Sequence, residues 1–111
     1  MTDDERTARI RALNDRLRRD DVGGRRMITA GVAELGPLFV YQTIEKIRSV
    51  DSFDDGDDPY QEHDFGSVDV CGIRLFWKID YYDPSFTQAA EDPADETVCG
   101  RLLTVMLAEE Y

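Results

Sequence analysis

Hydrophobic residues near the N-terminus recur at helical spacing. Ile10, Leu13 and Leu17 lie three and four residues apart, which places them on one face of an α-helix. A Thr-x-x-Glu capping box at residues 2–5 supplies the signal for a helix start. The pattern predicts a helix over about residues 3–20.

Two further elements are expected before the middle of the chain. Residues 25–32 carry β-branched side chains between glycines and predict a short strand. After a proline, which suits the first turn of a helix, Val40, Ile44 and Ile47 repeat at helical spacing. This second repeat predicts a helix over about residues 38–50.

The middle of the chain changes to a two-residue alternation. Val68 and Val70 share one face of an extended segment, and after a Cys-Gly pair the apolar side chains alternate from Ile73 to Tyr81. Residues 66–82 therefore predict a β-hairpin with one buried face.

The C-terminal part returns to a helical pattern. An Asp-Pro pair at residues 92–93 suits an N-cap followed by the first helical position. Val98, Leu102 and Val105 then form an apolar stripe, which neighbouring apolar residues broaden. We predict a helix over about residues 93–109 that lies against the sheet.

Together these elements predict one α+β domain over residues 1–111. The sheet is expected to be small and antiparallel, formed by the central hairpin and strand 25–32, and packed against two or three helices. Hydrophobic residues make up 41% of the chain and charged ones 33%, a balance that allows a modest core.

Charge is distributed unevenly along this chain. The net charge is -11, and residues 51–70 carry eight acidic and no basic residues. Such a field repels phosphate backbones, so we expect no direct binding to nucleic acid, whereas a basic groove on another protein would attract it. No apolar run approaches the roughly 20 residues that span a bilayer, and no signal peptide is evident. We therefore expect a cytoplasmic protein with no membrane partner; the oligomeric state stays open.

The densest acid lies in a loop, residues 51–64. Several positions match a calcium-binding loop, with Asp51 first and Glu62 last, but Phe53 occupies a ligand position and Asp58 the usual apolar one. The residues that follow also read as a strand instead of the helix that this motif requires. We interpret the loop as a hydrated acidic surface or a protein-binding surface.

Glu62, His63 and Asp64 are the main candidates for chemistry. A histidine beside carboxylates can act as a general base, or bind a metal with Asp80 or Asp83 as further ligands. Neighbours on an extended segment point to opposite faces, which opposes convergence of the three. A metal-dependent enzyme centred on them is the alternative hypothesis, beside a structural histidine that orders the loop through hydrogen bonds.

Other catalytic and cofactor motifs are missing from the sequence. There is no nucleophile elbow, no glycine-rich phosphate loop and no HExxH segment. Cys71 and Cys99 lack CxxC spacing, so we expect two reduced thiols. The sequence predicts no cofactor and favours a protein that is not an enzyme.

Four segments have distinctive sequences: residues 58–66, which contain EHDFG, the WKIDYYD segment Trp77–Asp83, residues 92–95, and the C-terminal residues 103–111. Together they resemble a family of small, functionally uncharacterised bacterial proteins, found mainly in proteobacteria and often on plasmids and other mobile elements. The resemblance implies no activity and no catalytic residue. It does imply glycine where this chain has Gln61, and only glycine freely takes positive φ.

The small size, the acid after residue 50 and the resemblance to mobile-element proteins lead to one preferred hypothesis. We expect a protein-binding inhibitor of the anti-CRISPR or anti-restriction type, whose partner is a protein with a basic surface, such as a nucleic-acid-binding effector complex. It would block that surface by charge mimicry. The residues expected to contact the partner are Asp54, Asp55, Asp57, Asp58, Tyr60, Glu62, Glu91, Asp92, Asp95 and Glu96.

Overall fold

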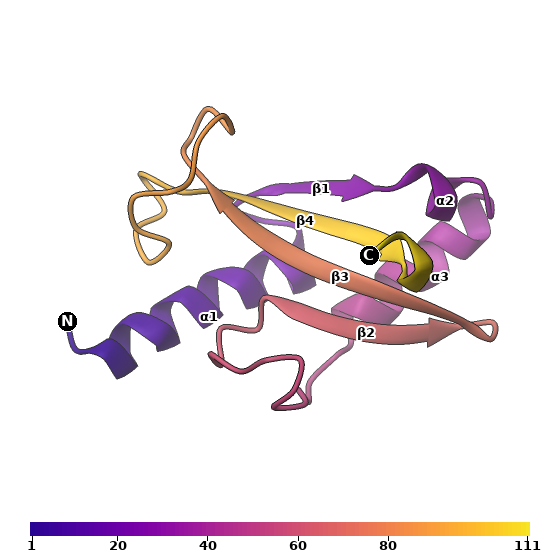
Figure 1. The fold of residues 1–111 in the computed structure, drawn as a ribbon, viewed down its shortest axis with the longest axis horizontal. Helices are drawn as coiled ribbons and strands as arrows, with labels where there is room; N and C mark the ends of the chain where they lie inside the picture. Colours follow the sequence, from indigo (N-terminus) through magenta and orange to yellow (C-terminus); the bar gives the residue numbers. More distant parts are fainter.

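Four strands form one mixed sheet in the computed structural model, which describes residues 1–111. Across the sheet they follow the order β1 (Arg25–Ile28), β4 (Gly100–Leu107), β3 (Ile73–Tyr82) and β2 (Phe65–Val70), as Figure 1 shows. β1 runs parallel to β4, and the other two pairings are antiparallel. The predicted α+β class is confirmed, but the sheet is mixed because β1 joins it in the parallel direction.

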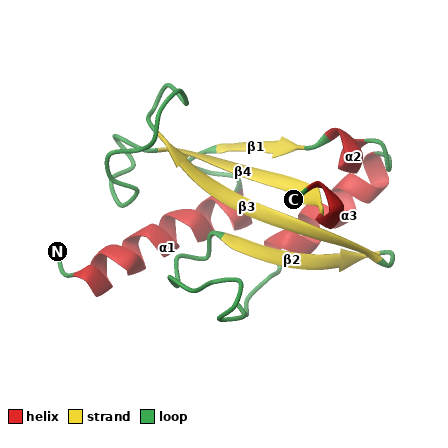
Figure 2. Cartoon of the chain, viewed as in Figure 1, coloured by secondary structure: helices red, strands yellow, loops and turns green.

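The helices lie mainly on one face of this sheet. They are α1 (Asp3–Asp20), the short α2 (Ala30–Ala33) and α3 (Pro37–Arg48), with a terminal 3₁₀ turn, η1 (Ala108–Glu110). In Figure 2, α1 and α3 lie behind the sheet, and η1 and the C-terminus lie in front of it. None of the helices combines the length and the apolar character needed to cross a membrane.

The predicted N-terminal helix is confirmed with its cap. Thr2 Oγ1 accepts the backbone N–H of Glu5 at 3.1 Å, and the Glu5 side chain accepts the N–H of Thr2, as a capping box requires. Ile10, Leu13 and Leu17 are each at most 2% exposed. The stripe read from the sequence is thus the face of α1 that packs into the core.

The other early elements are shorter than predicted. Strand 25–32 ends at Ile28, after which the chain turns into α2, and helix 38–50 becomes Pro37–Arg48. The hairpin is present, and its two turn residues, Cys71 and Gly72, have φ of 52° and 79°. Positive φ at both central positions is the conformation that a tight two-residue hairpin turn needs.

The predicted helix over residues 93–109 is wrong. Asp92 Oδ1 accepts the N–H of Ala94, and Asp95 Oδ1 accepts that of Thr97, so both acids close local turns instead of starting a helix. The apolar run that follows forms β4, the inner strand between β1 and β3. An inner strand that is buried on both faces has continuous apolar sequence, which also fits a helical stripe.

The core lies between the sheet and the helices. Trp77 of β3 has no exposed surface and faces Gly66 across the β2–β3 pairing. A Cβ atom added to Gly66 would lie 2.7 Å from the indole ring, so the strand carries glycine where the tryptophan needs the space.

Candidate functional site

The acidic loop, residues 51–64, connects α3 to β2. Its tip is a tight turn in which the Asp54 carbonyl accepts the N–H groups of Asp57 and Asp58 at 3.0 and 2.8 Å. Asp54 and Asp55 are exposed and Asp57 is half-buried. None of these three forms an ion pair with a lysine or an arginine. The tip therefore presents uncompensated negative charge on an ordered turn.

A polar network fixes the base of this loop to α1. The Asp58 carboxylate is buried, and it accepts the backbone N–H of His63 at 3.0 Å. His63 Nδ1 lies 2.8 Å from Asp15 Oδ1, and the ring stacks on Phe53 with centroids 3.7 Å apart. Arg18, itself buried, donates to the same Asp15 oxygen at 3.0 Å. This is the arrangement expected of a histidine that orders a loop.

A second network holds Glu62. Its carboxylate accepts the Tyr81 hydroxyl at 2.8 Å, and its carbonyl accepts the Asn14 amide at 3.0 Å. Arg101 Nε donates to the side-chain oxygen of Asn14 at 2.7 Å. Burial raises the pKa of Tyr81 above its usual range, so its hydroxyl keeps the proton that it donates. Glu62 is therefore half-buried, and its carboxylate is held by Tyr81.

The candidate metal ligands point into three different environments. Glu62 accepts a hydrogen bond from Tyr81, His63 contacts Asp15, and Asp64 lines a cavity together with Lys78 and Asp80. No group of three or more histidine, cysteine, aspartate or glutamate side chains is arranged to hold a metal ion.

Gln61 has a conformation that favours glycine. Its φ is 57°, which costs a residue with a side chain about 1–2 kcal/mol relative to a right-handed conformation. Arg11 Nη1 donates to the Gln61 carbonyl at 2.9 Å and helps to hold the strained residue. The glycine implied by the family resemblance at this position thus matches the backbone.

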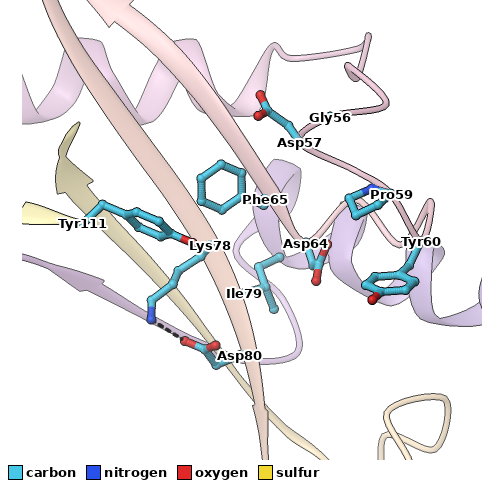
Figure 3. Close-up of a pocket in the computed structure, with 10 residues that line it drawn as sticks. All are labelled: Gly56, Asp57, Pro59, Tyr60, Asp64, Phe65, Lys78, Ile79, Asp80 and Tyr111. Carbon is cyan, nitrogen blue, oxygen red and sulfur yellow. Dashed lines mark ion pairs between the residues drawn. The ribbon is translucent and has the colours of Figure 1, made fainter.

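A cavity of about 360 Å³ lies between the acidic loop and the sheet face opposite the helices (Figure 3). Its only lining cation, Lys78, pairs with Asp80 at 3.1 Å. Asp64 has no such partner; burial raises its pKa, and the negative charges of Glu62, Asp58 and Asp80 raise it further. The remaining acid and the aromatic rings of the lining are Asp57, Tyr60, Phe65 and Tyr111.

The acidic residues of segment 91–96 are held differently. Asp92 pairs with Arg6 at 2.9 Å, and Glu96 pairs with Arg16 at 2.6 Å. The Arg16 guanidinium lowers the pKa of Glu96, and the hydrogen bonds from Thr97 lower that of Asp95. In Figure 1 the segment lies beside the N-terminal half of α1, away from the acidic loop. Asp92 and Glu96 thus pair with three arginines of α1, Arg6, Arg9 and Arg16, whereas Glu91 and Asp95 form no ion pair.

Sequence reasoning missed the inward polar residues of α1. Asn14 and Arg18 occupy positions four residues after Ile10 and Asn14, directly on the apolar stripe. A polar residue on the apolar face of a predicted helix indicates a buried hydrogen-bonding group, and this pattern was visible in the sequence. Tyr111 carried no such signal, because its contacts with Phe65 and Phe76 depend on how the C-terminus folds back over the sheet.

A protein-family model described as "Protein of unknown function (DUF3768)" matches residues 28–110. The chain belongs to this family. The residues matched to the DUF3768 family contain the acidic loop, the hairpin and β4, whereas α1 and most of β1 precede them. No curated protein and no solved structure matches the chain.

Proposed function

We propose that this DUF3768 protein binds another protein through the acidic loop and the adjoining cavity, and that it thereby blocks a basic, nucleic-acid-binding surface. The observation that carries the proposal is the uncompensated charge of Asp54, Asp55 and Asp57 at the loop tip. In segment 91–96, by contrast, Asp92 and Glu96 are paired with arginines.

The loop suits this role because its charges are already ordered. Asp58 and His63 tie its base to α1, and Phe53 stacks beneath the histidine. An ordered loop loses less conformational entropy on binding than a mobile one, so more of the electrostatic attraction contributes to affinity.

The cavity supplies a place for one basic side chain of the partner. Asp64 stays half-buried without a cation, an arrangement that opposes stability and that a lysine or arginine would relieve. Tyr60 and Tyr111 are 73% and 74% exposed at its rim. Aromatic faces favour a guanidinium, and exposed tyrosines are common anchors in interfaces.

The resemblance to mobile-element proteins suggests which class of protein the partner belongs to. We place the protein in the cytoplasm of a bacterium, where a CRISPR effector or a restriction nuclease would offer a basic channel of this kind. The contact surface consists of Asp54, Asp55, Asp57 and Tyr60, with Asp64 added. Asp58 and Glu62 support it from inside, and Glu91, Asp92, Asp95 and Glu96 are left out of it.

A metal-dependent activity centred on Glu62, His63 and Asp64 is not proposed, because each side chain has a different set of neighbours.

The test is a competition assay with purified CRISPR effector complexes and restriction nucleases. Binding of each to labelled target DNA is measured by fluorescence anisotropy with increasing amounts of the protein. We expect inhibition of at least one of them. The triple variant Asp54→Asn, Asp55→Asn, Asp57→Asn should weaken it at least about tenfold, and added salt should weaken it further.

The matched control removes the same number of charges elsewhere. Asp92→Asn, Asp95→Asn, Glu96→Gln lowers the negative charge equally but leaves the loop intact. It should inhibit like the parent protein. Equal losses of inhibition in both triple variants would show that only the net charge matters and would contradict a specific role of the loop. Inhibition that changes neither with the loop variant nor with salt would also contradict the proposal.

A further inference from the structure

β1 is an open edge of the sheet. It pairs only with β4, and Figure 1 shows no element along its other side. Arg25, Arg26 and Met27 are all exposed. An uncovered edge presents backbone N–H and C=O groups that another strand can bond.

The direction of these backbone groups follows from the parallel pairing. Thr29, just after β1, donates its N–H to the Val105 carbonyl at 3.1 Å. Alternate residues of an extended strand direct their backbone groups to opposite edges, so Arg25 and Met27 share the side of Thr29 and bond β4. The N–H and C=O groups of Arg26 and Ile28 therefore point away from the sheet. Neither residue forms a backbone hydrogen bond outside the strand ladder.

A groove runs along this edge on the sheet face opposite the helices. It has a volume of about 590 Å³, and its apolar lining includes Met27, Leu102, Tyr82 and Phe86. Met27, although part of this lining, is 50% exposed. Side chains of an added strand would cover the groove and the methionine together.

The two arginines of β1 determine which kind of strand can pair with this edge. Arg25 stacks on Phe86 at 4.0 Å and forms no ion pair, and Arg26 pairs with Asp21 at 3.8 Å. Two copies of β1 paired about a two-fold axis would bring arginines of both chains together, which disfavours self-pairing. The complementary occupant carries acidic residues, and the groove requires apolar ones between them.

We propose that β1 binds an extended segment of a partner protein in which apolar and acidic residues alternate, and that this segment adds to the sheet as a fifth strand. Main-chain hydrogen bonds to Arg26 and Ile28 supply affinity, and the groove and the arginines supply specificity. The site lies at the opposite edge of the sheet from β2 and the acidic loop, so this inference is independent of the proposed function.

The test uses a short fluorescein-labelled peptide of alternating valine and glutamate, measured by anisotropy against the full chain. Arg26→Pro removes the outward N–H but no bond to β4, because proline is tolerated where an edge strand faces solvent. Arg26→Gln removes the same charge and keeps the N–H. We expect Arg26→Pro to bind the peptide about tenfold more weakly than Arg26→Gln does.

Two further peptides keep the test decisive if Arg26→Pro does not fold. A valine–lysine peptide should not bind, and a valine–glutamate peptide with N-methylated alternate amides should lose binding. Equal binding of the methylated peptide would overturn strand addition. A concentration-dependent dimer that Arg26→Pro abolishes would overturn it in favour of self-pairing. The Asp54, Asp55, Asp57 triple variant should bind the peptide like the parent, which separates this site from the acidic loop.

Discussion

Asn14 illustrates how single polar residues organise the interior. It has no exposed surface, yet its amide donates to Glu62 and Tyr81, and its oxygen accepts from Arg101. Buried polar groups are tolerated when each finds a partner. Asp64 departs from this rule, because it forms no ion pair, and the negative charges of Glu62, Asp58 and Asp80 add to the effect of burial in raising its pKa. The contribution of Asp64 to the free energy of unfolding should therefore depend on pH.

Asp64→Asn should increase the free energy of unfolding at pH 7. The raised pKa of Asp64 means that the native state holds the proton more tightly than the unfolded chain. Its favourable contribution is full below the unfolded pKa of about 3.9 and is lost as the pH rises through the raised native value. The gain from the substitution should therefore shrink as the pH falls towards about 4. Urea denaturation across this pH range measures it.

Asp83→Asn is a control that should change the free energy of unfolding in the opposite direction. The hydrogen bonds that Asp83 accepts from Thr87 and Ser85 lower its pKa, with that from the Thr87 backbone contributing most. Its contribution is present above the unfolded pKa and is lost as the pH falls through the lowered native value. This variant should be less stable than the parent at pH 7. If Asp64→Asn were less stable than the parent protein at pH 7, the Asp64 carboxylate would have to be stabilised by a partner, which would contradict this prediction.

At the scale of elements, helix α1 and the hairpin were predictable and β4 was not. Local spacing identifies an amphipathic helix or a hairpin with one buried face, because each has one apolar side. β4 has two: Leu103 and Val105 face the helices, while Thr104 and Met106 are buried on the other face. Because both faces of β4 are buried, its sequence lacks the alternation of apolar and polar residues that marks a strand. This burial depends on the neighbouring strands and is not visible in the local sequence.

Gly66→Ala should destabilise the β2–β3 pair by about 1–3 kcal/mol, the usual cost of overpacking. The added methyl group would lie 2.7 Å from the Trp77 indole, which is fully buried and cannot easily move. Ser67→Ala, on the opposite face of the same strand, should change stability by less than about 0.5 kcal/mol. Guanidinium denaturation compares the two, and equal effects would rule out the tryptophan contact as the cause.

At the scale of the whole molecule, charge is separated across the sheet. The β2 edge carries the acidic loop, the β1 edge carries Arg25 and Arg26, and the net charge is -11. The molecule measures 42 × 30 × 23 Å, comparable with the electrostatic screening length of about 30 Å at 0.01 M salt. Its acidic groups therefore repel one another across the fold at low ionic strength.

Stability should therefore rise with salt. Between about 0.01 and 0.1 M NaCl the screening length falls from about 30 to 10 Å. We expect the melting temperature to increase by about 4 °C, the shift that about 1 kcal/mol produces in a small domain. The loop triple variant should show a smaller increase, because it carries less charge. A melting temperature that falls as salt is added would contradict repulsion among the acidic groups.

The sequence by itself determined α1, α3, the hairpin and the position of the acid, because periodicity, caps and composition are local properties. Tertiary structure decided the rest. It made residues 100–107 a strand, joined His63 to Asp15, and paired Asp92 and Glu96 with α1 while leaving the loop tip unpaired. Pairing and burial depend on residues far apart in the chain, so spacing alone could not distinguish a neutralised carboxylate from one free to bind.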